Sequence, residues 1–535
     1  MVHLTQPVAT TPHRPAASPA STEPSRPPPP SLLDQGRALV HRASRIASYN
    51  VALVTGMAHP SVPHLRGSPL LGLLPQLCER GNDAVLESLY ALAEGRGLAY
   101  GWIATRPIYI LRDPALIRQV FVQQAANVSR VSDTGTAPFD TLKRLVGDST
   151  FTAQGKTWQR LRGNLLSEFF AVSGLRGKFA EVHAISGKHV EALTAAGVAA
   201  DLRKVASAYA LEAIWKVTLG IDGMDAYNEE LSGGLQHILT LAASPAHAWR
   251  HVMDALKNFR SLNELDDEEK VARAEFDALV ERLVLSVHGD KLNPEAEGPL
   301  TPVQMVSKLT GGTADRPLTE ETLSQIRLVV VGGHETTGLT LSWALYELGR
   351  HPAVAAKIRE ELRAHGAEAT ASFEGLAELK YLEAVLEETL RLHPPVPFAA
   401  RETKTDIDLL TQDGVVQVYA GAQVIVPTRH LHQDVEIWGS DAAAFRPERF
   451  VGRNRHALIQ AAELMSFSTG PRRCPGFHLS LLEAKLFLAR LLGHHDIILT
   501  DDRPVGNNID SVLRPASAIP ARIVAVSDSR SDTAP

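Results

Sequence analysis

The 535-residue sequence predicts a mainly α-helical protein that also carries small β-sheets. Three patterns support this prediction. Thr319 and the two glutamates after it are typical of a helix start, and the helical pattern then runs to Arg350. A second helical pattern follows Cys474, with leucines at helical spacing up to Gly493. Residues 402–427, in contrast, alternate apolar and polar side chains between Gly and Asp turns, as small antiparallel sheets do.

The composition is that of a globular protein able to bury a large core, with 44% hydrophobic and 21% charged residues. The formal net charge of -6 favours neither nucleic acid nor an anionic membrane surface as the main partner. No segment has the length of a transmembrane helix, and the N-terminus lacks the plan of a signal peptide. The two cysteines, Cys78 and Cys474, indicate a reducing compartment without a disulfide framework. We therefore expect a soluble cytoplasmic protein, with Cys78 as a small buried side chain.

The segments between these patterns can also be assigned. Residues 1–33 are rich in Pro, Ser, Thr and Ala and predict a disordered tail, followed by a weak helical pattern from Leu32 to Val54. Ile103–Leu111 predicts a strand interrupted by Pro107. Further helices are expected over residues 175–295, broken at Ser244-Pro245, and over Pro352–His365, where Pro starts the helix and Gly follows it. The polar residues 527–535 predict a frayed end.

The most informative stretch is Phe467-Ser-Thr-Gly470-Pro-Arg472-Arg473-Cys474-Pro-Gly476. Because Cys474 lies at or just before a helix N-terminus and beside two arginines, its surroundings favour a thiolate. Three interpretations remain open for it. It could be an inert buried cysteine, a nucleophile, or a thiolate ligand to haem iron.

Two other segments break local rules. Gly332-Gly-His-Glu-Thr-Thr337 places two glycines and a polar cluster in the middle of the long predicted helix. Two adjacent glycines weaken a helix by about 1 kcal/mol each, so this centre indicates either a kink or a functional site. Trp158 and Arg162 stand four residues apart and so share one helix face. They could be a core tryptophan with a surface arginine, or two donors to an anion.

The cysteine stretch resembles, at every fixed position, the haem-binding signature Phe-x-x-Gly-x-Arg-x-Cys-x-Gly of the cytochrome P-450 family. The resemblance implies a heme b cofactor whose iron takes Cys474 as its axial thiolate ligand. The cofactor-binding residues that it implies are Phe467, Gly470, Arg472, Cys474, Gly476, the Trp-x-x-x-Arg pair Trp158 and Arg162, and Arg401.

The glycine–threonine stretch is similar to the oxygen-activation motif of the same family. The resemblance implies that Thr336 holds bound oxygen and a water, and that Glu335 relays protons from solvent. Glu388 and Arg391 resemble the family's buried Glu-x-x-Arg pair, which Arg449 of Pro447-Glu-Arg-Phe450 is expected to join. The segment from Leu513 to Val526 resembles the family's closing hairpin.

The matches run in the family's order from about residue 60 to 526. They imply one catalytic domain over residues 34–526, with the family's helix-rich triangular prism and a long central helix over the haem. The missing anchor makes the chain similar to the soluble, bacterial members. No reductase is expected after residue 526, so a separate ferredoxin- or flavodoxin-type donor and its reductase would supply electrons from NAD(P)H.

The resemblance implies a monooxygenase that uses O2 to hydroxylate or epoxidise a small apolar molecule. Val396, Phe398, Ala399 and Ala400 form an apolar stretch that suits terpenoid, fatty-acyl or polyketide-like substrates equally. One alternative is a peroxide-using or isomerising haem-thiolate relative. A second alternative is a non-enzymatic haem- or ligand-binding protein. The intact Glu335–Thr336 pair counts against both.

Overall fold

The computed structural model describes residues 61–68, 71–103, 106–132, 139–165, 170–195, 199–222, 228–258, 260–288, 292–295, 302–509 and 511–526. The predicted tails 1–33 and 527–535 and the weak helical pattern over residues 32–54 lie outside these residues.

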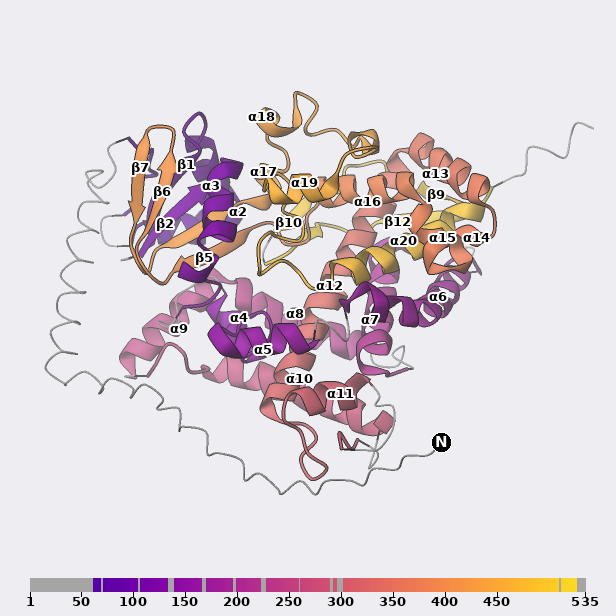
Figure 1. The fold of residues 1–535 in the computed structure, drawn as a ribbon, viewed down its shortest axis with the longest axis horizontal. Helices are drawn as coiled ribbons and strands as arrows, with labels where there is room; N and C mark the ends of the chain where they lie inside the picture. The colour runs from indigo at the N-terminus through magenta and orange to yellow at the C-terminus, as the bar shows by residue number, and fades with distance from the viewer. Residues whose placement is uncertain are drawn as a thin grey trace, which may run out of the picture. The chain divides into compact units, whose positions relative to one another are not determined.

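The helix α12 (Glu320–Arg350) passes through the middle of the described helices (Figure 1). Its 31 residues make it about 46 Å long. The predicted bounds are confirmed, because Thr319 caps the helix. The Thr319 hydroxyl accepts a hydrogen bond from the Thr322 N–H at 3.1 Å, and the Thr319 N–H donates to Thr322 Oγ1 at 3.3 Å. Two backbone N–H groups at the start of the helix, which have no acceptor within the helix, are thereby hydrogen-bonded.

The glycines of α12 do not break the helix, and two of them let α7 (Leu202–Leu219) approach closely. A Cβ on Gly333 would lie 2.5 Å from Ile214 Cδ1, and a Cβ on Gly338 would lie 3.3 Å from the Cα of Ser207. Packing against α7 therefore offsets the intrinsic weakness of glycine in a helix.

Other helices pack with α7 and α12 around a large apolar core that includes the fully buried Trp215, Trp343 and Phe487. They are α6 (Val172–Ala195), α13 (Pro352–His365), α16 (Lys380–Leu392) and α20 (Phe477–His494). The predicted bounds of α13 are confirmed. The α20 helix starts three residues after Cys474, as its pattern predicted.

The helical character predicted for residues 175–295 is confirmed for α6 to α10, although the short strand β4 (Ala200–Asp201) interrupts these helices, and the break at Ser244-Pro245 separates α8 from α9. The helices not yet named are α2 (Leu74–Leu92), α3 (Pro114–Arg118), the π-helix η1 (Gln119–Gln123), the 3-10 helix η2 (Ala125–Asn127), α4 (Asp140–Val146), α5 (Gly155–Leu165), α8 (Asn228–Ala243), α9 (Pro245–Lys257), α10 (Asp267–His288), α11 (Pro302–Leu309), α14 (Glu368–Ala371), α15 (Phe373–Glu378), α17 (Thr428–Leu431), α18 (Val435–Trp438), the 3-10 helix η6 (Pro447–Arg449) and α19 (Arg455–Gln460).

The largest described sheet has five strands in the order β1-β2-β8-β5-β3. Its strands are β1 (Leu98–Ile103), β2 (Arg106–Leu111), β3 (Val128–Ser129), β5 (Ala399–Thr403) and β8 (Gln423–Val426). The single strand predicted over residues 103–111 is wrong. Ile103 ends β1, and β2 pairs back on it with Leu98 opposite Leu111 and Pro107 opposite Trp102. The chain reverses between Ile103 and Arg106, which a pattern of apolar residues alone does not reveal.

The small sheet predicted over residues 402–427 is confirmed in part. β6 (Ile407–Thr411) and β7 (Gly414–Val418) form an antiparallel hairpin, but the fully buried β8 joins β2 and β5 in the large sheet. The closing hairpin expected over residues 513–526 is wrong. There β11 (Leu513–Pro515) pairs with β10 (Asn507–Ile509), whereas β12 (Pro520–Ala525) pairs with β4 (Ala200–Asp201) and β9 (His495–Leu499).

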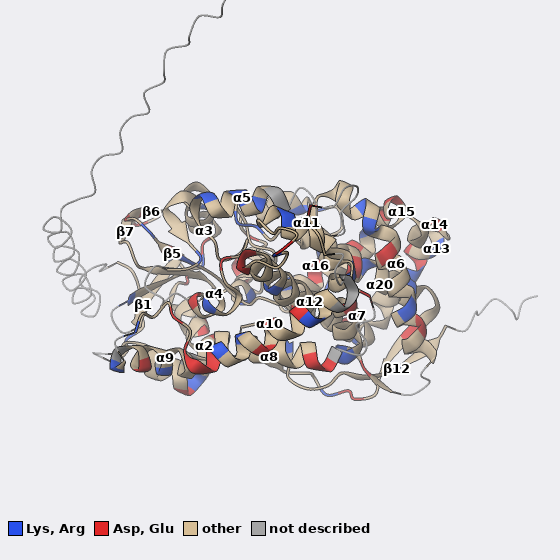
Figure 2. Ribbon diagram, turned by 90° about the horizontal axis from the view of Figure 1, so that it is seen from below, with Lys and Arg blue, Asp and Glu red and all other residues tan. Residues whose placement is uncertain are grey.

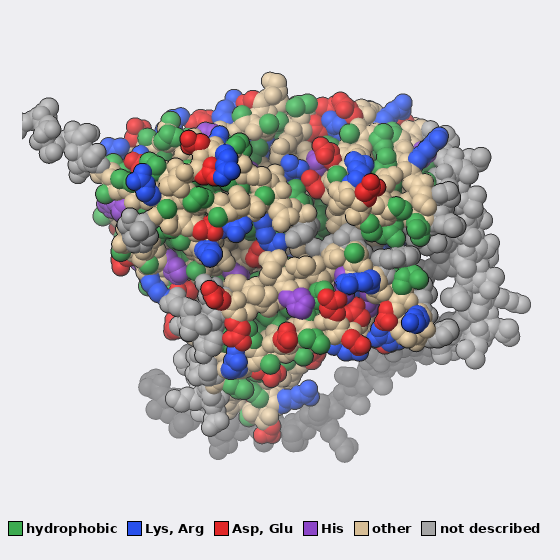
Figure 3. Space-filling model, turned by 180° about the vertical axis from the view of Figure 1, so that it is seen from behind, with side chains coloured by type: hydrophobic (Ala, Val, Ile, Leu, Met, Phe, Trp, Pro, Cys, Tyr) green, Lys and Arg blue, Asp and Glu red, His purple; other side chains and the backbone are tan. Residues whose placement is uncertain are grey.

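The described surface mixes charges of both signs. Figure 2 shows acidic and basic residues interspersed along the helices, and Figure 3 shows hydrophobic side chains scattered among polar and charged ones on the opposite face from Figure 1. Of the described helices, none combines the length and the apolar composition that a membrane crossing requires.

A buried ion-pair network joins α16 to the segment before the cysteine loop. Arg391 Nε lies 2.6 Å from Glu388 Oε2 and Arg449 Nε lies 3.4 Å from Glu388 Oε1, with all three side chains almost fully buried. Arg391 also donates to the carbonyl oxygens of His432 and Ala442, both at 2.6 Å. The predicted participation of Arg449 in the Glu388–Arg391 pair is confirmed.

We expect Arg391→Ala to lower the free energy of unfolding by about 3–5 kcal/mol, because the buried carboxylate of Glu388 then has one cationic partner instead of two. The matched control is Arg160→Ala. Arg160 pairs with Glu321 at 2.7 Å on the surface, where such pairs contribute about 0–1 kcal/mol. Urea unfolding followed by far-UV circular dichroism measures both, and equal losses would contradict the assignment.

Candidate functional site

The loop that carries Cys474 lies between α19 and α20 and is closed by its own backbone. The Cys474 N–H donates to the Phe467 carbonyl at 2.9 Å, and the Arg473 N–H donates to the Gly470 carbonyl at 3.1 Å. Gly470 has a φ of +71°, and a Cβ there would lie 2.1 Å from the Phe121 carbonyl oxygen. Only glycine fits that position, because both the conformation and the space exclude a side chain.

Cys474 is a partly exposed residue, but its thiol is buried and lies among cations. Burial raises the pKa of the thiol. The Gly476 N–H and the charges of Arg130, Arg162 and Arg473 act in the opposite direction. These groups stabilise a thiolate more than a neutral thiol. Cys78 is exposed rather than buried, so the prediction made for it is wrong.

Four arginines from separate segments converge beside this loop, and we call Arg130, Arg162, Arg401 and Arg472 the arginine cluster. Burial lowers the pKa of Arg130, and the charges of Arg401 and Arg472 lower it further. Burial and Arg472 lower the pKa of Arg401 to about 9, and burial and Arg162 lower that of Arg472 to about 10.

Among the described residues, the arginine cluster has no carboxylate partner within ion-pair distance and bonds instead to backbone carbonyls. Arg162 Nη2 donates to the Arg473 carbonyl at 2.5 Å, and Arg472 Nη1 donates to that of Ala153 at 2.8 Å. Arg401 Nη1 donates to the Ala400 carbonyl at 2.7 Å, and Arg130 donates to the carbonyl of Arg472. Buried cations without counter-charges are costly, so the cluster fits an anionic group.

Unpaired donors and open glycines mark where such a group fits. Trp158 Nε1 and Arg401 Nη2 are buried without a hydrogen-bond partner in the described chain. The Arg472 guanidinium lies 4.1 Å from the centre of the Trp158 ring. A Cβ on Gly332 would meet nothing within 4 Å, and a Cβ on Gly476 would meet only a Phe170 ring carbon at 3.8 Å.

The structure therefore brings together most of the residues predicted from the sequence. Trp158 and Arg162 on α5, Arg401 on β5 and Arg472 beside Cys474 meet at one place. Phe467 packs instead against the ring of Phe477, with ring centres 5.9 Å apart.

Arg130 was missed by the sequence analysis. Its signal was a charged residue in the otherwise uncharged run Val128-Ser-Arg-Val131, which proves to be buried throughout. A charged residue in a buried segment needs a compensating partner, because a buried charge is seldom left uncompensated.

The Glu335–Thr336 pair lies on α12 and makes separate contacts. Thr336 Oγ1 donates to the Gly332 carbonyl one turn earlier at 2.6 Å, on a part of α12 that protein leaves partly uncovered. Glu335 Oε1 accepts from Arg514 Nε at 2.8 Å. No hydrogen bond among the described residues joins either side chain to the Cys474 loop. The nearest link is the neighbouring Thr337, which donates to Ser480 on α20 at 3.1 Å.

His334 has a structural contact. Its ring is buried, and Nε2 lies 2.8 Å from the Ser207 hydroxyl on α7. Burial lowers the pKa of His334, so the ring is neutral near pH 7. The residue helps to hold α12 against α7.

Comparison with known proteins agrees with this arrangement. The cytochrome P-450 family model matches residues 62–519. A putative cytochrome P-450, CYP13A10 of Caenorhabditis elegans, is 27% identical over 489 residues, which cover 83% of this chain and 90% of that protein. Cytochrome P-450 3A12 of Canis lupus familiaris is 27% identical over 432 residues, covering 78% and 82%. Cytochrome P-450 72A68 of Medicago truncatula is 39% identical over 173 residues, or 32% of each chain.

The helical fold around α12 and the extent of the family match define a haem-thiolate monooxygenase, an oxidoreductase that uses O2 and a redox partner. The chain belongs to the cytochrome P-450 family. The predictions of family, fold class and type of enzyme are thereby confirmed.

A buried acid on α20 gives the site a pH-dependent neighbour. Burial raises the pKa of Glu483 to about 8, although a hydrogen bond with Thr337 acts in the opposite direction. Between about pH 4.5 and 8 the Glu483 carboxyl therefore keeps its proton in the folded chain and loses it in the unfolded chain.

We expect the free energy of unfolding to fall as pH rises from about 5 to about 8, because over that range the folded state binds the extra proton. Glu483→Gln, which stays neutral, should reduce this fall. Each unit of raised pKa corresponds to about 1.4 kcal/mol. Urea unfolding at pH 5, 6.5 and 8 measures the effect, with the partly exposed Glu321→Gln as control. An unchanged pH dependence in Glu483→Gln would show that the acid is ionised in the folded chain.

Proposed function

We propose that Cys474 is the axial ligand of a heme b held in one domain over residues 34–526. The arginine cluster supports this proposal, because haem carries two propionates and these four buried or partly buried cations have no carboxylate partner in the described chain. When bound, the haem supplies the reductive activation of O2.

Each residue of the proposed haem site has a physical task. Arg162, Arg401 and Arg472 supply charge for the propionates, and Trp158 supplies an indole N–H that has no partner within the described chain. Gly470 allows the turn that closes the loop. Gly476, where a Cβ would have little protein contact, leaves room beside Cys474. Phe467 accepts the Cys474 N–H at its carbonyl and so orients the loop.

Arg130 joins these residues as a cofactor-binding arginine in our proposal. Its guanidinium lies 4.2 Å from the centre of the Phe151 ring, and burial and its cationic neighbours lower its pKa. Both observations are consistent with a guanidinium that an anionic ligand would neutralise.

We propose that Thr336 and Glu335 deliver protons during O2 activation. The Thr336 hydroxyl lies one turn from Gly332, where the surface of α12 is open, and its present acceptor is only a backbone carbonyl. Glu335 lies next to it but forms an ion pair with Arg514. Proton relay by Glu335 therefore requires it to exchange Arg514 for water, which its partial exposure allows.

The proposed substrate is a small apolar molecule, of terpenoid, fatty-acyl or polyketide type, that is hydroxylated or epoxidised. Support comes from an aromatic group in which Phe139 stacks on Phe398 at 5.9 Å and meets the edge of Phe151 at 5.2 Å. Val396 beside it is 39% exposed, which an apolar ligand would cover.

We also propose that a separate ferredoxin- or flavodoxin-type protein and its reductase pass electrons from NAD(P)H. A cytoplasmic compartment is proposed because the chain has only two cysteines and these form no disulfide with each other, as expected of a reducing environment.

The first test is the absorption spectrum of the reduced protein with carbon monoxide. We expect the red-shifted Soret band that gives the family its name, and we expect Cys474→Ser to lose it because the thiolate is gone. The control Cys78→Ser changes the other, exposed thiol and should keep the band. A normal band in Cys474→Ser, or none in the wild type, would remove the assignment of Cys474.

The second test concerns proton delivery. Thr336→Ala should divert electrons from product to hydrogen peroxide, because the hydroxyl beside Gly332 is lost. Peroxide released per NAD(P)H consumed is the measurement, with any fatty acid or terpenoid that supports turnover. Thr340→Ala is the matched control, since Thr340 makes the same type of bond, to the Thr336 carbonyl at 2.9 Å, but is buried. Equal uncoupling in both variants would contradict the role of Thr336 in proton delivery.

A further inference from the structure

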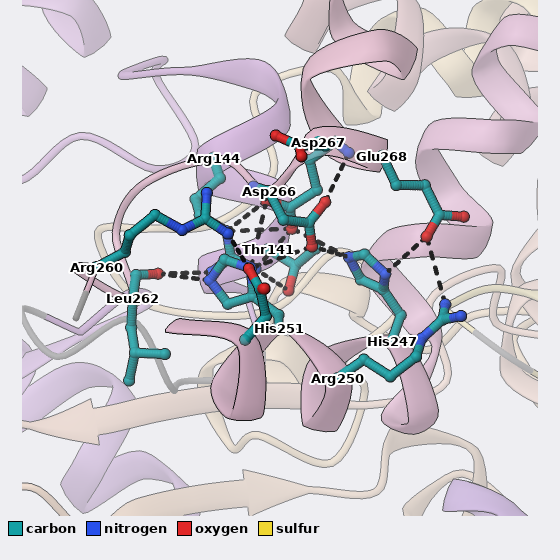
Figure 4. A network of polar contacts seen from close by, with 12 residues as sticks. Thr141, Arg144, His247, Arg250, His251, Arg260, Leu262, Asp266, Asp267 and Glu268 are labelled. Carbon is teal, nitrogen blue, oxygen red and sulfur yellow. Dashed lines mark hydrogen bonds and ion pairs between the residues drawn. The ribbon is translucent and has the colours of Figure 1, made fainter. Parts of the chain in front are cut away.

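A cluster of histidines and carboxylates lies outside the proposed haem site, between α9 and the start of α10. Figure 4 shows His247 and His251 on the side of α9 that faces Asp266. The two histidines are four residues apart and so share one helix face. His247, His251 and Glu269 are 2%, 4% and 0% exposed, so the cluster is built into the interior.

Three ligand-type atoms converge within this cluster. His247 Nε2 lies 3.2 Å from Glu269 Oε1 and 3.4 Å from Asp266 Oδ2. The ligand atoms offered by His247, Asp266 and Glu269 all lie within 4.8 Å of one another. A tetrahedral zinc ion with bonds of about 2.0–2.1 Å holds its ligand atoms about 3.3 Å apart. The two separations from His247 Nε2 therefore match the edges of such a site.

The same separations are long for hydrogen bonds between a charged imidazole and a carboxylate, which are about 2.7–2.9 Å. In this molecule His189 and His393 lie 2.7 Å from Glu212 and Glu347. Distance alone does not decide, because His430 lies 3.3 Å from Asp83 without any third ligand. The convergence of three buried or half-buried donors is what distinguishes the cluster.

The outer nitrogen of His251 meets an acceptor, as is typical of histidines that bind metal, whereas that of His247 is buried without a hydrogen-bond partner among the described residues. His247 Nδ1 lies 3.5 Å from a Glu268 carboxylate oxygen, and His251 Nε2 lies 3.1 Å from the Leu262 carbonyl. If His251 donates there, its Nδ1 faces Asp266 Oδ2 at 3.2 Å, and either a proton or a metal ion must lie between these two atoms. His251 Nδ1 therefore stands beside the fourth coordination position.

Helix capping and an ion pair explain part of the cluster, but not the histidines. Asp266 and Glu269 cap α10 reciprocally through their backbone N–H groups, at 2.8 and 3.1 Å. Arg144 of α4 donates to both oxygens of Glu269, at 2.7 and 2.9 Å. Arg144 offsets only one of the two carboxylate charges.

We propose that His247, Asp266 and Glu269 bind a divalent transition-metal ion of the zinc type, with His251 beside the fourth position. Two imidazole nitrogens and two carboxylates form a donor set that suits zinc. The bound ion joins α9 to α10, while Arg144 continues the contact to α4. The occupied site holds these three segments together.

The test uses the full-length, haem-loaded protein, stripped with chelator and equilibrated with zinc by dialysis. Mass spectrometry of the metal gives zinc per chain, and X-ray absorption at the zinc edge gives the ligands. We expect one tightly held zinc with nitrogen and oxygen ligands. His247→Ala and Asp266→Asn should each weaken binding by about tenfold or more. Asp266→Asn keeps the oxygen that caps α10, so folding is preserved.

The matched control is His189→Gln, which removes a histidine–carboxylate contact that has no third metal-ligand side chain. It should bind zinc as the wild type does. The chain has 21 histidines, so stoichiometry alone does not locate the metal. Zinc should also slow hydrogen exchange over residues 245–257 in the wild type and in His189→Gln only. No zinc uptake, or equal affinity in all four proteins, would overturn the proposal and leave a histidine–carboxylate network that works without metal.

Discussion

The site depends on one electrostatic constraint, which is the burial of several like charges at one point. Arg130, Arg401 and Arg472 repel one another in surroundings that water screens poorly, and burial lowers the pKa of each. No carboxylate of the described chain pairs with them, and backbone carbonyls satisfy only some of their donors. A fold that keeps such an arrangement needs an anionic ligand to complete it. The proposed haem site rests on this electrostatic argument, which does not depend on any sequence motif.

The rest of the fold keeps that point rigid. The α12 helix is held against α7 by close contacts at Gly333 and Gly338 and by the bond between His334 and Ser207. On the other side of the cysteine loop, the carboxylate of Glu388 pairs with two arginines, and their remaining donors reach backbone carbonyls. These interactions are buried, so removing one partner is far more costly than removing a surface pair.

The molecule treats buried charge in two different ways. In the arginine cluster the charges have one sign and no carboxylate of the described residues compensates them, which is why we propose a bound anionic ligand. Between α9 and α10 both signs are present, because Arg144 and two histidines face Asp266 and Glu269. That second cluster could be neutralised by protons or by a metal ion. The separations of 3.2–3.4 Å around His247 are what favour the metal. The two clusters are also chemically independent, so either can be tested without disturbing the other.

The sequence by itself determined the features that depend on a few adjacent residues. The bounds of α12 and α13 followed from Thr319, Pro352 and Gly366, since capping is a matter of a few adjacent residues. The cysteine loop was recognisable because its glycines, arginine and cysteine lie within ten residues. Only the tertiary structure decided which strands pair, that β8 leaves the small sheet, that Cys78 is exposed, that Arg130 is buried and that Arg514 holds Glu335. Several of these facts depend on residues far apart in the chain, such as Ile108 with Gln423 and Glu335 with Arg514, and no local pattern records which distant segment supplies the partner.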